Sequence, residues 1–264
     1  MKIPFQQIDA FADQPFTGNP AAVMPLEAWL DDATLQAIAA ENNLAETAFI
    51  VPWLADDADF ELRWFTPAVE VALCGHATLA TGHALLSARS AADRVRFATR
   101  QAGILEVARD GAGYRLALPA WEVMPKPLPA QAAALGGRPV ETHWREGGYA
   151  LFVYASVAEI LELSPDFRTM RSFGDVLFIA TARGTETDIV SRVFAPGAGI
   201  DEDPVTGSAH CMLTTYWAKR LGRDSFTAFQ ASARGGHLRC TLEGDRVVLG
   251  GQCVTVIEGV FNIS

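Results

Sequence analysis

Hydrophobic and polar residues alternate along several short segments, which is the pattern of a half-buried β-strand. The clearest case is residues 60–64, where Phe60, Leu62 and Trp64 alternate with Glu61 and Arg63. Other segments of strand length and composition lie at residues 3–12, 21–25, 44–51, 142–144, 150–154, 175–180, 188–194 and 254–263. The chain is therefore predicted to contain many short strands.

Two segments between these strands are predicted to be helices without a polar face. Residues 76–89 and 209–220 are apolar almost all round, so each helix must be enclosed on several sides. A third helix is predicted to begin at Asp31-Asp32, either of which can cap it, and to end at Asn42-Asn43, because asparagine tolerates left-handed backbone geometry. Shorter helices are expected at residues 130–135 and 157–163.

The two halves of the chain repeat one another. Residues 65–78 and 194–209 each contain Phe-x-Pro, an acidic residue and a glycine that opens an apolar helix. Similar strands follow each helix, at 97–101 and 226–230, 103–105 and 236–238, and 114–118 and 245–249. A repeat of half the chain indicates a duplicated domain. We therefore predict an α+β fold of two pseudo-symmetric domains, each a curled, mostly antiparallel β-sheet or barrel wrapped around a central α-helix.

A proline-rich segment separates the halves. Four of the eleven residues 119–129 are proline, which favours an extended connection. We place the N-terminal repeat domain at residues 1–120 and the C-terminal repeat domain at 121–264. Whether residues 254–264 cross back to complete the sheet of the first domain is left open.

Composition narrows the classes of partner and compartment. The 264 residues include 31 acidic and 21 basic ones, a net charge of −10, which argues against a nucleic-acid partner. No segment has the roughly 20 apolar residues that a membrane span requires, and the start of the chain has no apolar signal core. The four cysteines show no CxxC spacing. We expect a cytoplasmic protein with free thiols and no membrane partner.

The sequence offers few sites for a cofactor. It contains neither a GxGxxG motif nor a glycine-rich phosphate loop, so nucleotide chemistry is not expected. His76 with His83, or His237 with Cys240, would be partial metal sites, but neither forms a set of three or four ligands. We therefore expect no metal and no cofactor, which leaves proton transfer by acidic and basic side chains.

The two glycine-opened helices suggest where a substrate binds. Carboxylates at residues 201–203 precede the second helix, although acidic residues are also common there for capping alone. The N-termini of the two helices, facing one cleft, would offer free N–H groups to a substrate carboxylate. The groups expected around that cleft are Cys74, Gly75, His76, Asp203, Thr206, Gly207 and Ser208.

Five motifs carry a family resemblance. They are residues 16–20 (FTGNP), 43–47 (NLAET), 74–78 (CGHAT) and 202–208 (EDPVTGS), and Gln230 with 234–236 (RGG). In this order along nearly the whole chain, they resemble the PhzF family of phenazine biosynthesis-like isomerases, which has the diaminopimelate epimerase fold. The resemblance implies a homodimer and a small unsaturated, hydroxylated amino acid as substrate, similar to dihydro-hydroxyanthranilate.

The resemblance also implies roles for individual residues. Glu46 carries the proton from one carbon to another, and His76 and Asp203 complete the acid/base set. Gly75, Gly207 and Ser208 hold the substrate carboxylate. Ala45 stands where family members often have a polar residue, so its contact with the substrate would be through the backbone only.

Two other functions remain open at the level of sequence. A two-thiol amino-acid racemase or epimerase of the same fold would use Cys74, but Thr206 stands where the second thiol belongs. A non-catalytic protein that binds small acids is the other alternative. Each residue also has a structural interpretation of its own: Glu46 as a solvated edge charge, His76 as a packed core histidine and Asp203 as only a cap.

Overall fold

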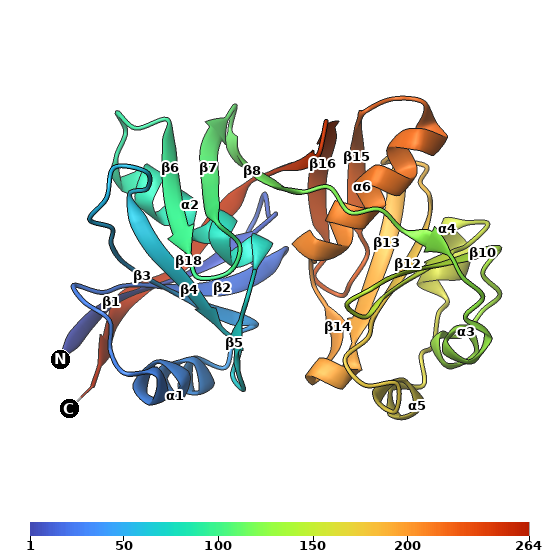
Figure 1. Ribbon diagram of the computed structural model, residues 1–264, viewed down its shortest axis with the longest axis horizontal. Coiled ribbons are helices and arrows are strands. Elements are labelled where there is room, and N and C mark those ends of the chain that lie inside the picture. The colour runs from blue at the N-terminus through green and yellow to red at the C-terminus, as the bar shows by residue number, and fades with distance from the viewer. Residues whose placement is uncertain (264) are drawn as a thin grey trace. The chain divides into compact units, whose positions relative to one another are not determined.

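The computed structural model describes residues 1–263, which form two compact units. The first unit contains residues 1–118 and the C-terminal segment from Val248, and the second contains residues 119–247. The C-terminal segment forms β18 (Cys253–Asn262), which pairs antiparallel with β1 (Lys2–Ala10). Figure 1 shows these two strands, red and blue, running beside each other. The crossing left open by the sequence is therefore made.

The other elements of the first unit follow in chain order. They are β2 (Asn19–Pro25), α1 (Asp32–Asn42), β3 (Glu46–Pro52), β4 (Phe60–Phe65), β5 (Glu70–Val71), α2 (Gly75–Ala88), β6 (Arg94–Thr99), β7 (Ile104–Asp110) and β8 (Gly113–Pro119). Strand β2 is antiparallel to β1 and parallel to β3, β3 is antiparallel to β4, β4 is parallel to β6, and β6 to β8 form a meander. Most pairings are antiparallel, as predicted.

The second unit repeats this pairing scheme. Its elements are β9 (Met124–Pro125), α3 (Pro129–Leu135), β10 (Glu141–Arg145), β11 (Tyr149–Val153), α4 (Val157–Leu161), α5 (Phe167–Arg171), β12 (Leu177–Arg183), β13 (Ile189–Ala195), η1 (Pro196–Ala198), β14 (Ile200–Asp203), α6 (Gly207–Leu221), β15 (Ser225–Gln230), β16 (Gly236–Glu243) and β17 (Arg246–Gly251), the last spanning the boundary to the first unit. The series β10 to β13, β15 and β16 has the same parallel and antiparallel neighbours as β1 to β4, β6 and β7. The predicted duplication is therefore visible in the strand pairing.

Each central helix is the crossover that a parallel strand pair requires. Helix α2 connects β4 to β6 by way of β5, and α6 connects β13 to β15 by way of β14. Helix α2 packs against β1, β2, β3, β6, β7 and β18, and its first eight residues are buried. Helix α6 is buried from Ala209 to Ala218 and contacts β16. The predicted enclosure of both helices is confirmed, and Figure 1 shows each among the strands of its own unit.

The ends of the helices agree with sequence signals except in one place. Asp31 caps α1 by accepting a hydrogen bond from the Thr34 N–H, and Asn43 ends the helix at a φ of 48°. The carboxylates at residues 201–203, however, lie in strand β14 and not in the first turn of α6, which contains no acidic residue. An acidic helix start therefore does not explain them. Two short elements that the sequence did not suggest, α5 and η1, precede β14.

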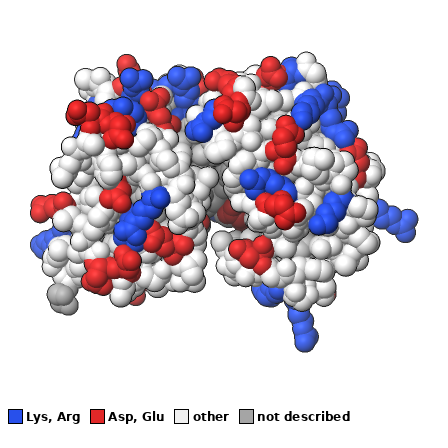
Figure 2. All heavy atoms as spheres, viewed as in Figure 1, with Lys and Arg blue, Asp and Glu red and all other residues white. Residues whose placement is uncertain are grey.

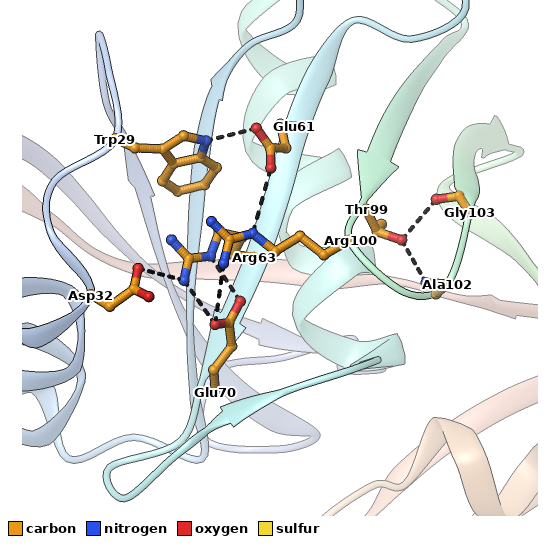
Figure 3. A network of polar contacts seen from close by, with 9 residues as sticks. All are labelled: Trp29, Asp32, Glu61, Arg63, Glu70, Thr99, Arg100, Ala102 and Gly103. Carbon is orange, nitrogen blue, oxygen red and sulfur yellow. Dashed lines mark hydrogen bonds and ion pairs between the residues drawn. The ribbon is translucent and has the colours of Figure 1, made fainter.

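The alternation in β4 places Arg63 on the polar face, yet its side chain is only 1% exposed. Its guanidinium donates two hydrogen bonds to Glu70 on β5, at 2.8 and 2.7 Å, and one to Asp32 at the start of α1. Figure 3 shows this cluster, in which the indole of Trp29 covers the guanidinium. The prediction for Arg63 was wrong because α1 covers this face and two carboxylates balance the buried charge.

Two further observations concern the helices and the surface charge. Among the described residues, no helix is long and apolar enough to cross a membrane. On the face shown in Figure 2, acidic and basic side chains of the described chain are interspersed, with no extended basic patch.

Candidate active site

The first unit brings together three predicted side chains, Glu46, Cys74 and His76. Glu46 is the first residue of β3, and Cys74 and His76 flank the first residue of α2. The Glu46 Oε2 and His76 Nε2 atoms lie 3.0 Å apart, with the carboxylate side chain 13% and the imidazole 5% exposed. On the other edge of the ring, His76 Nδ1 lies 3.5 Å from Cys74 Sγ and 3.2 Å from Asn19 Nδ2. Glu46 and His76 thus form a buried acid/base pair.

The strand register explains why these residues meet. Strand β2 is parallel to β3, with Ala21 opposite Glu46, and its first residue, Asn19, supports the imidazole. Gly18 has a φ of 64°, and a Cβ there would lie 2.2 Å from the Ala10 carbonyl oxygen. Glycine at this position therefore allows the turn that delivers Asn19. Asn19 belongs to the FTGNP motif, but its contact with His76 could not be predicted from the motif alone.

The charge states of the group follow from burial and proximity. Burial raises the pKa of the Cys74 thiol to about 11, and the Glu46 carboxylate adds to this rise. Burial alone would lower the pKa of His76, but the adjacent Cys74 and Glu46 outweigh it, so that the pKa stands well above its usual value. Because Cys74 is a neutral thiol at pH 7, the Glu46 charge is the one that favours imidazolium. Glu46 therefore favours the protonated ring of His76, beside a thiol that is a weak base.

The contact between Glu46 and His76 is close but not aligned as a hydrogen bond. Within the described chain, Glu46 Oε2 and His76 Nε2 are both buried and neither has a hydrogen-bond partner. Buried polar atoms without such a partner are uncommon and often mark a functional site. The two atoms therefore keep capacity for a reacting group.

The start of α2 lacks a side-chain cap. Its N-cap, Cys74, makes no capping hydrogen bond through its side chain, so the first N–H groups of the helix lack that partner. The Cys74 carbonyl instead accepts a hydrogen bond from Thr78 Oγ1 at 2.6 Å. Gly75, the first residue of the helix, is buried. The helix dipole and these N–H groups favour negative charge here.

The second unit brings together Asp203, Thr206 and Gln230. Asp203 ends β14, and its carboxylate accepts a hydrogen bond from the Thr206 hydroxyl. The fully buried Gln230 accepts from the Thr206 N–H at 2.9 Å and donates to the Asp203 carbonyl at 2.7 Å. This amide therefore fixes the turn between β14 and α6, and with it the position of the carboxylate. Gln230 was quoted as a motif residue, but this anchoring role was missed.

Gly207 and Ser208 form the first turn of α6, whose N-cap, Thr206, again makes no side-chain capping bond. Ser208 is half-buried and lies beside Tyr149, a residue that no sequence motif includes. His210 Nδ1 contacts the Thr206 carbonyl at 2.8 Å, as Thr78 does for Cys74 in the first unit. Burial lowers the pKa of His210 to about 4, so it is neutral and donates this bond.

The remaining candidates are placed as follows. Ala45 directly precedes Glu46 and is half-buried. His83 hydrogen-bonds Tyr114 and Thr255, at 3.1 and 3.0 Å, and His237 packs against Phe229. Neither histidine therefore extends the group around His76.

Comparison with known proteins decides the family. A family model described as phenazine biosynthesis-like protein (PhzC-PhzF) matches residues 8–259. The chain belongs to the PhzF family. A Pseudomonas aeruginosa protein named as an isomerase is 47% identical over 265 residues, and the match covers 100% of both chains. The crystal structure of a PhzF-family protein from Enterococcus faecalis matches with a TM-score of 0.91 at 40% identity, covering 100% of both chains.

The fold of this PhzF-family chain extends to more distant proteins. A hydroxyproline epimerase from Agrobacterium vitis matches with a TM-score of 0.65 at 12% identity, covering 98% of this chain and 92% of that one. At such low identity the likeness concerns the fold alone. The predicted family and fold class are both confirmed.

Proposed function

We propose that this PhzF-family chain is a cofactor-independent isomerase that moves a proton within a small unsaturated, hydroxylated amino acid. The observation that carries the proposal is the buried contact of 3.0 Å between Glu46 and His76. A carboxyl group is negative when ionised and an imidazole is positive when protonated. Held together in a buried place, such a pair is suited to general acid/base catalysis. The isomerase name of the Pseudomonas aeruginosa relative supports the same reaction class.

In the proposed reaction, Glu46 is the proton carrier. Its carboxylate removes a proton from one substrate carbon, leaving the electron pair in the conjugated system, and the resulting carboxylic acid returns the proton to another carbon. His76, as imidazolium, places a positive charge 3.0 Å from the Glu46 carboxylate before the first step. Burial of both side chains limits the loss of the proton to solvent.

The second unit supplies the other parts of the proposal. Asp203 completes the acid/base set, held by Thr206. Gly207 and Ser208 at the start of α6, with Gly75 at the start of α2, bind the substrate carboxylate, because free helix N–H groups favour anions. Ala45 contributes a backbone contact. We also propose that the protein works in the cytoplasm as a homodimer.

The proposal is tested by isomer formation and deuterium uptake in D2O. Wild type and Glu46→Gln would be incubated with dihydro-hydroxyanthranilate and a panel of cyclic and unsaturated amino acids, read by mass spectrometry. We expect wild type to convert a member of the panel, with deuterium uptake only to the extent that the proton on Glu46 exchanges with solvent before it is returned. Loss of a general base typically costs about 10²–10⁴-fold, so Glu46→Gln should lose at least that much.

A matched control separates the chemistry from damage to the fold. Glu41→Gln makes the same change at an exposed position on α1 and should keep the wild-type rate. Conversion that survives Glu46→Gln would place the base elsewhere. Tight binding of a panel acid by wild type, with neither conversion nor uptake of deuterium, would favour the non-catalytic alternative.

The structure disfavours the two-thiol racemase. A thiolate is the active form of a cysteine base, and the pKa of Cys74, about 11, leaves it protonated at pH 7. Thr206, in the corresponding place of the second unit, donates its hydroxyl proton to Asp203. Neither residue is arranged as a base.

A further inference from the structure

The group around His76 contains one member that proton transfer does not need. Glu46, Cys74 and His76 each place one potential ligand atom within 4.8 Å of the other two. The proposed reaction uses the carboxylate and the imidazole, whereas the thiol of Cys74 has no part in it. We propose that these three side chains bind one divalent metal ion of the zinc class, and that the bound ion blocks proton transfer by Glu46.

The distances approach those of a bound metal ion, but one side chain must rotate to complete the site. Tetrahedral zinc with bonds of about 2.3 Å to sulfur and about 2.0 Å to nitrogen separates these ligand atoms by about 3.5 Å. Cys74 Sγ lies 3.5 Å from His76 Nδ1, and Glu46 Oε2 lies 3.0 Å from Nε2. The ring can give only one nitrogen to the ion. Either Cys74 therefore rotates toward Nε2, which Glu46 already faces, or Glu46 rotates toward Nδ1, which Cys74 already faces.

Unmet bonding capacity and charge both favour a cation here. Glu46 Oε2 and His76 Nε2 are buried without a hydrogen-bond partner in the described chain. A metal ion bound to one of these atoms would give that atom the partner it lacks. A carboxylate and a thiolate together neutralise a dication, so the complex is electroneutral in a largely dry setting. On binding, the Cys74 thiol and the His76 imidazolium each release one proton to solvent, and the electron pairs left on sulfur and on the ring nitrogen form the bonds to the metal. No oxidant or reductant is required.

The donor set also limits the kind of metal. Sulfur and imidazole ligands select zinc and similar borderline-soft ions over magnesium or calcium, which prefer oxygen. Three protein ligands leave the fourth position of zinc to water. The ion would thus occupy the carboxylate on which the proposed isomerase depends. The binding of metal stands apart from the proposed function, whereas its inhibitory effect rests on that function.

The test uses the full chain, reduced and freed of metal, titrated with Co²⁺ and then Zn²⁺. We expect one equivalent of Co²⁺ to give a thiolate-to-cobalt charge-transfer band, which Zn²⁺ abolishes. Cys74→Ser should lose the band and bind at least about 100-fold more weakly, since changes outside the ligand shell already cost about 10–100-fold. The matched control is Cys240→Ser, which removes another buried thiol from the second unit and should keep the band.

Three results would overturn the proposal: no thiolate band in wild type, unchanged metal affinity in Cys74→Ser, or equal loss in Cys240→Ser. His76→Gln adds a second variant, expected to lose the band while thermal unfolding shows an intact fold. The deuterium assay with and without Zn²⁺ tests inhibition. Binding of metal by a protein without turnover would refute the proposed function alone, and turnover unaffected by a stoichiometric bound ion would refute the inhibitory part.

Discussion

The buried Arg63 cluster makes a quantitative prediction for Glu70→Gln. The substitution keeps the shape of the side chain but removes the charge that two hydrogen bonds tie to a guanidinium only 1% exposed. The other carboxylate bound to Arg63, Asp32, is 71% exposed and compensates less. Removing one partner of a buried ion pair costs about 3–5 kcal/mol. Because Glu70 is itself 32% exposed, water replaces part of the loss, and we expect about 2–3 kcal/mol.

The pH dependence of this loss has a definite sign. Hydrogen bonding to Arg63 holds the pKa of Glu70 below its ordinary value of 4.5. A carboxyl whose pKa is depressed in the folded state stabilises the protein above its unfolded pKa, and this contribution disappears as the pH falls through the folded pKa. The difference between wild type and Glu70→Gln should therefore be full at pH 7 and shrink steadily below pH 4.5.

The assay is unfolding in urea, with hydrogen exchange in peptides of β4 as the readout. This readout measures the first unit by itself. The control is Glu106→Gln, whose partner Arg94 is 3.7 Å away and 67% exposed. Exposed pairs contribute about 0–1 kcal/mol, so this variant should be close to wild type. Equal losses in the two variants, or a loss in Glu70→Gln that persists at low pH, would refute the reasoning.

Two further predictions concern the two helix starts, and a third concerns the turn before β2. Alkylation of Cys74 by iodoacetamide at pH 7 should be at least about 100-fold slower than that of an exposed cysteine, because its pKa of about 11 leaves little thiolate. Mass spectrometry measures the two rates, and equal rates would contradict the assigned burial. His210 is neutral when folded, with a pKa of about 4, so the free energy of unfolding should fall by up to about 3 kcal/mol as the pH drops from 6.5 to 4, and urea titrations of His210→Gln should lack this fall. Gly18→Ala should destabilise the first unit by more than Gly103→Ala in thermal unfolding, because both have a positive φ but only Gly18 has a carbonyl oxygen in the way, 2.2 Å from the new Cβ; similar losses would show that strain in φ alone decides.

Local sequence signals predicted the elements of the fold well. The caps of α1 at Asp31 and Asn43 and the enclosure of both apolar helices follow from rules that act over a few residues. The duplication could also be found, because the spacing of its motifs survives in the sequence. What could not be found were features set by tertiary packing. The burial of Arg63 depends on α1 covering one face of β4, which the alternation of β4 does not encode.

The candidate site shows the same division. The family resemblance singled out Glu46, His76 and Asp203, and the structure gives the first two a shared contact. Their supports, Asn19 and Gln230, were present in the motifs but had no assigned task, because an amide side chain can serve many roles. The closeness of Glu46 to Cys74 was also hidden, since these two residues meet only after β3 and α2 have packed.

The pairing of β18 with β1 has a consequence for the order in which the protein folds as it is made. The first unit needs residues from Val248 onward, so it lacks its closing strand until β18 has left the ribosome. The second unit, residues 119–247, is complete earlier. Domains generally fold as units as they emerge, with the N-terminal one first. In this chain the usual order is reversed, because the second unit can finish folding first. One edge of strand β1 stays unpaired until β18 has been synthesised.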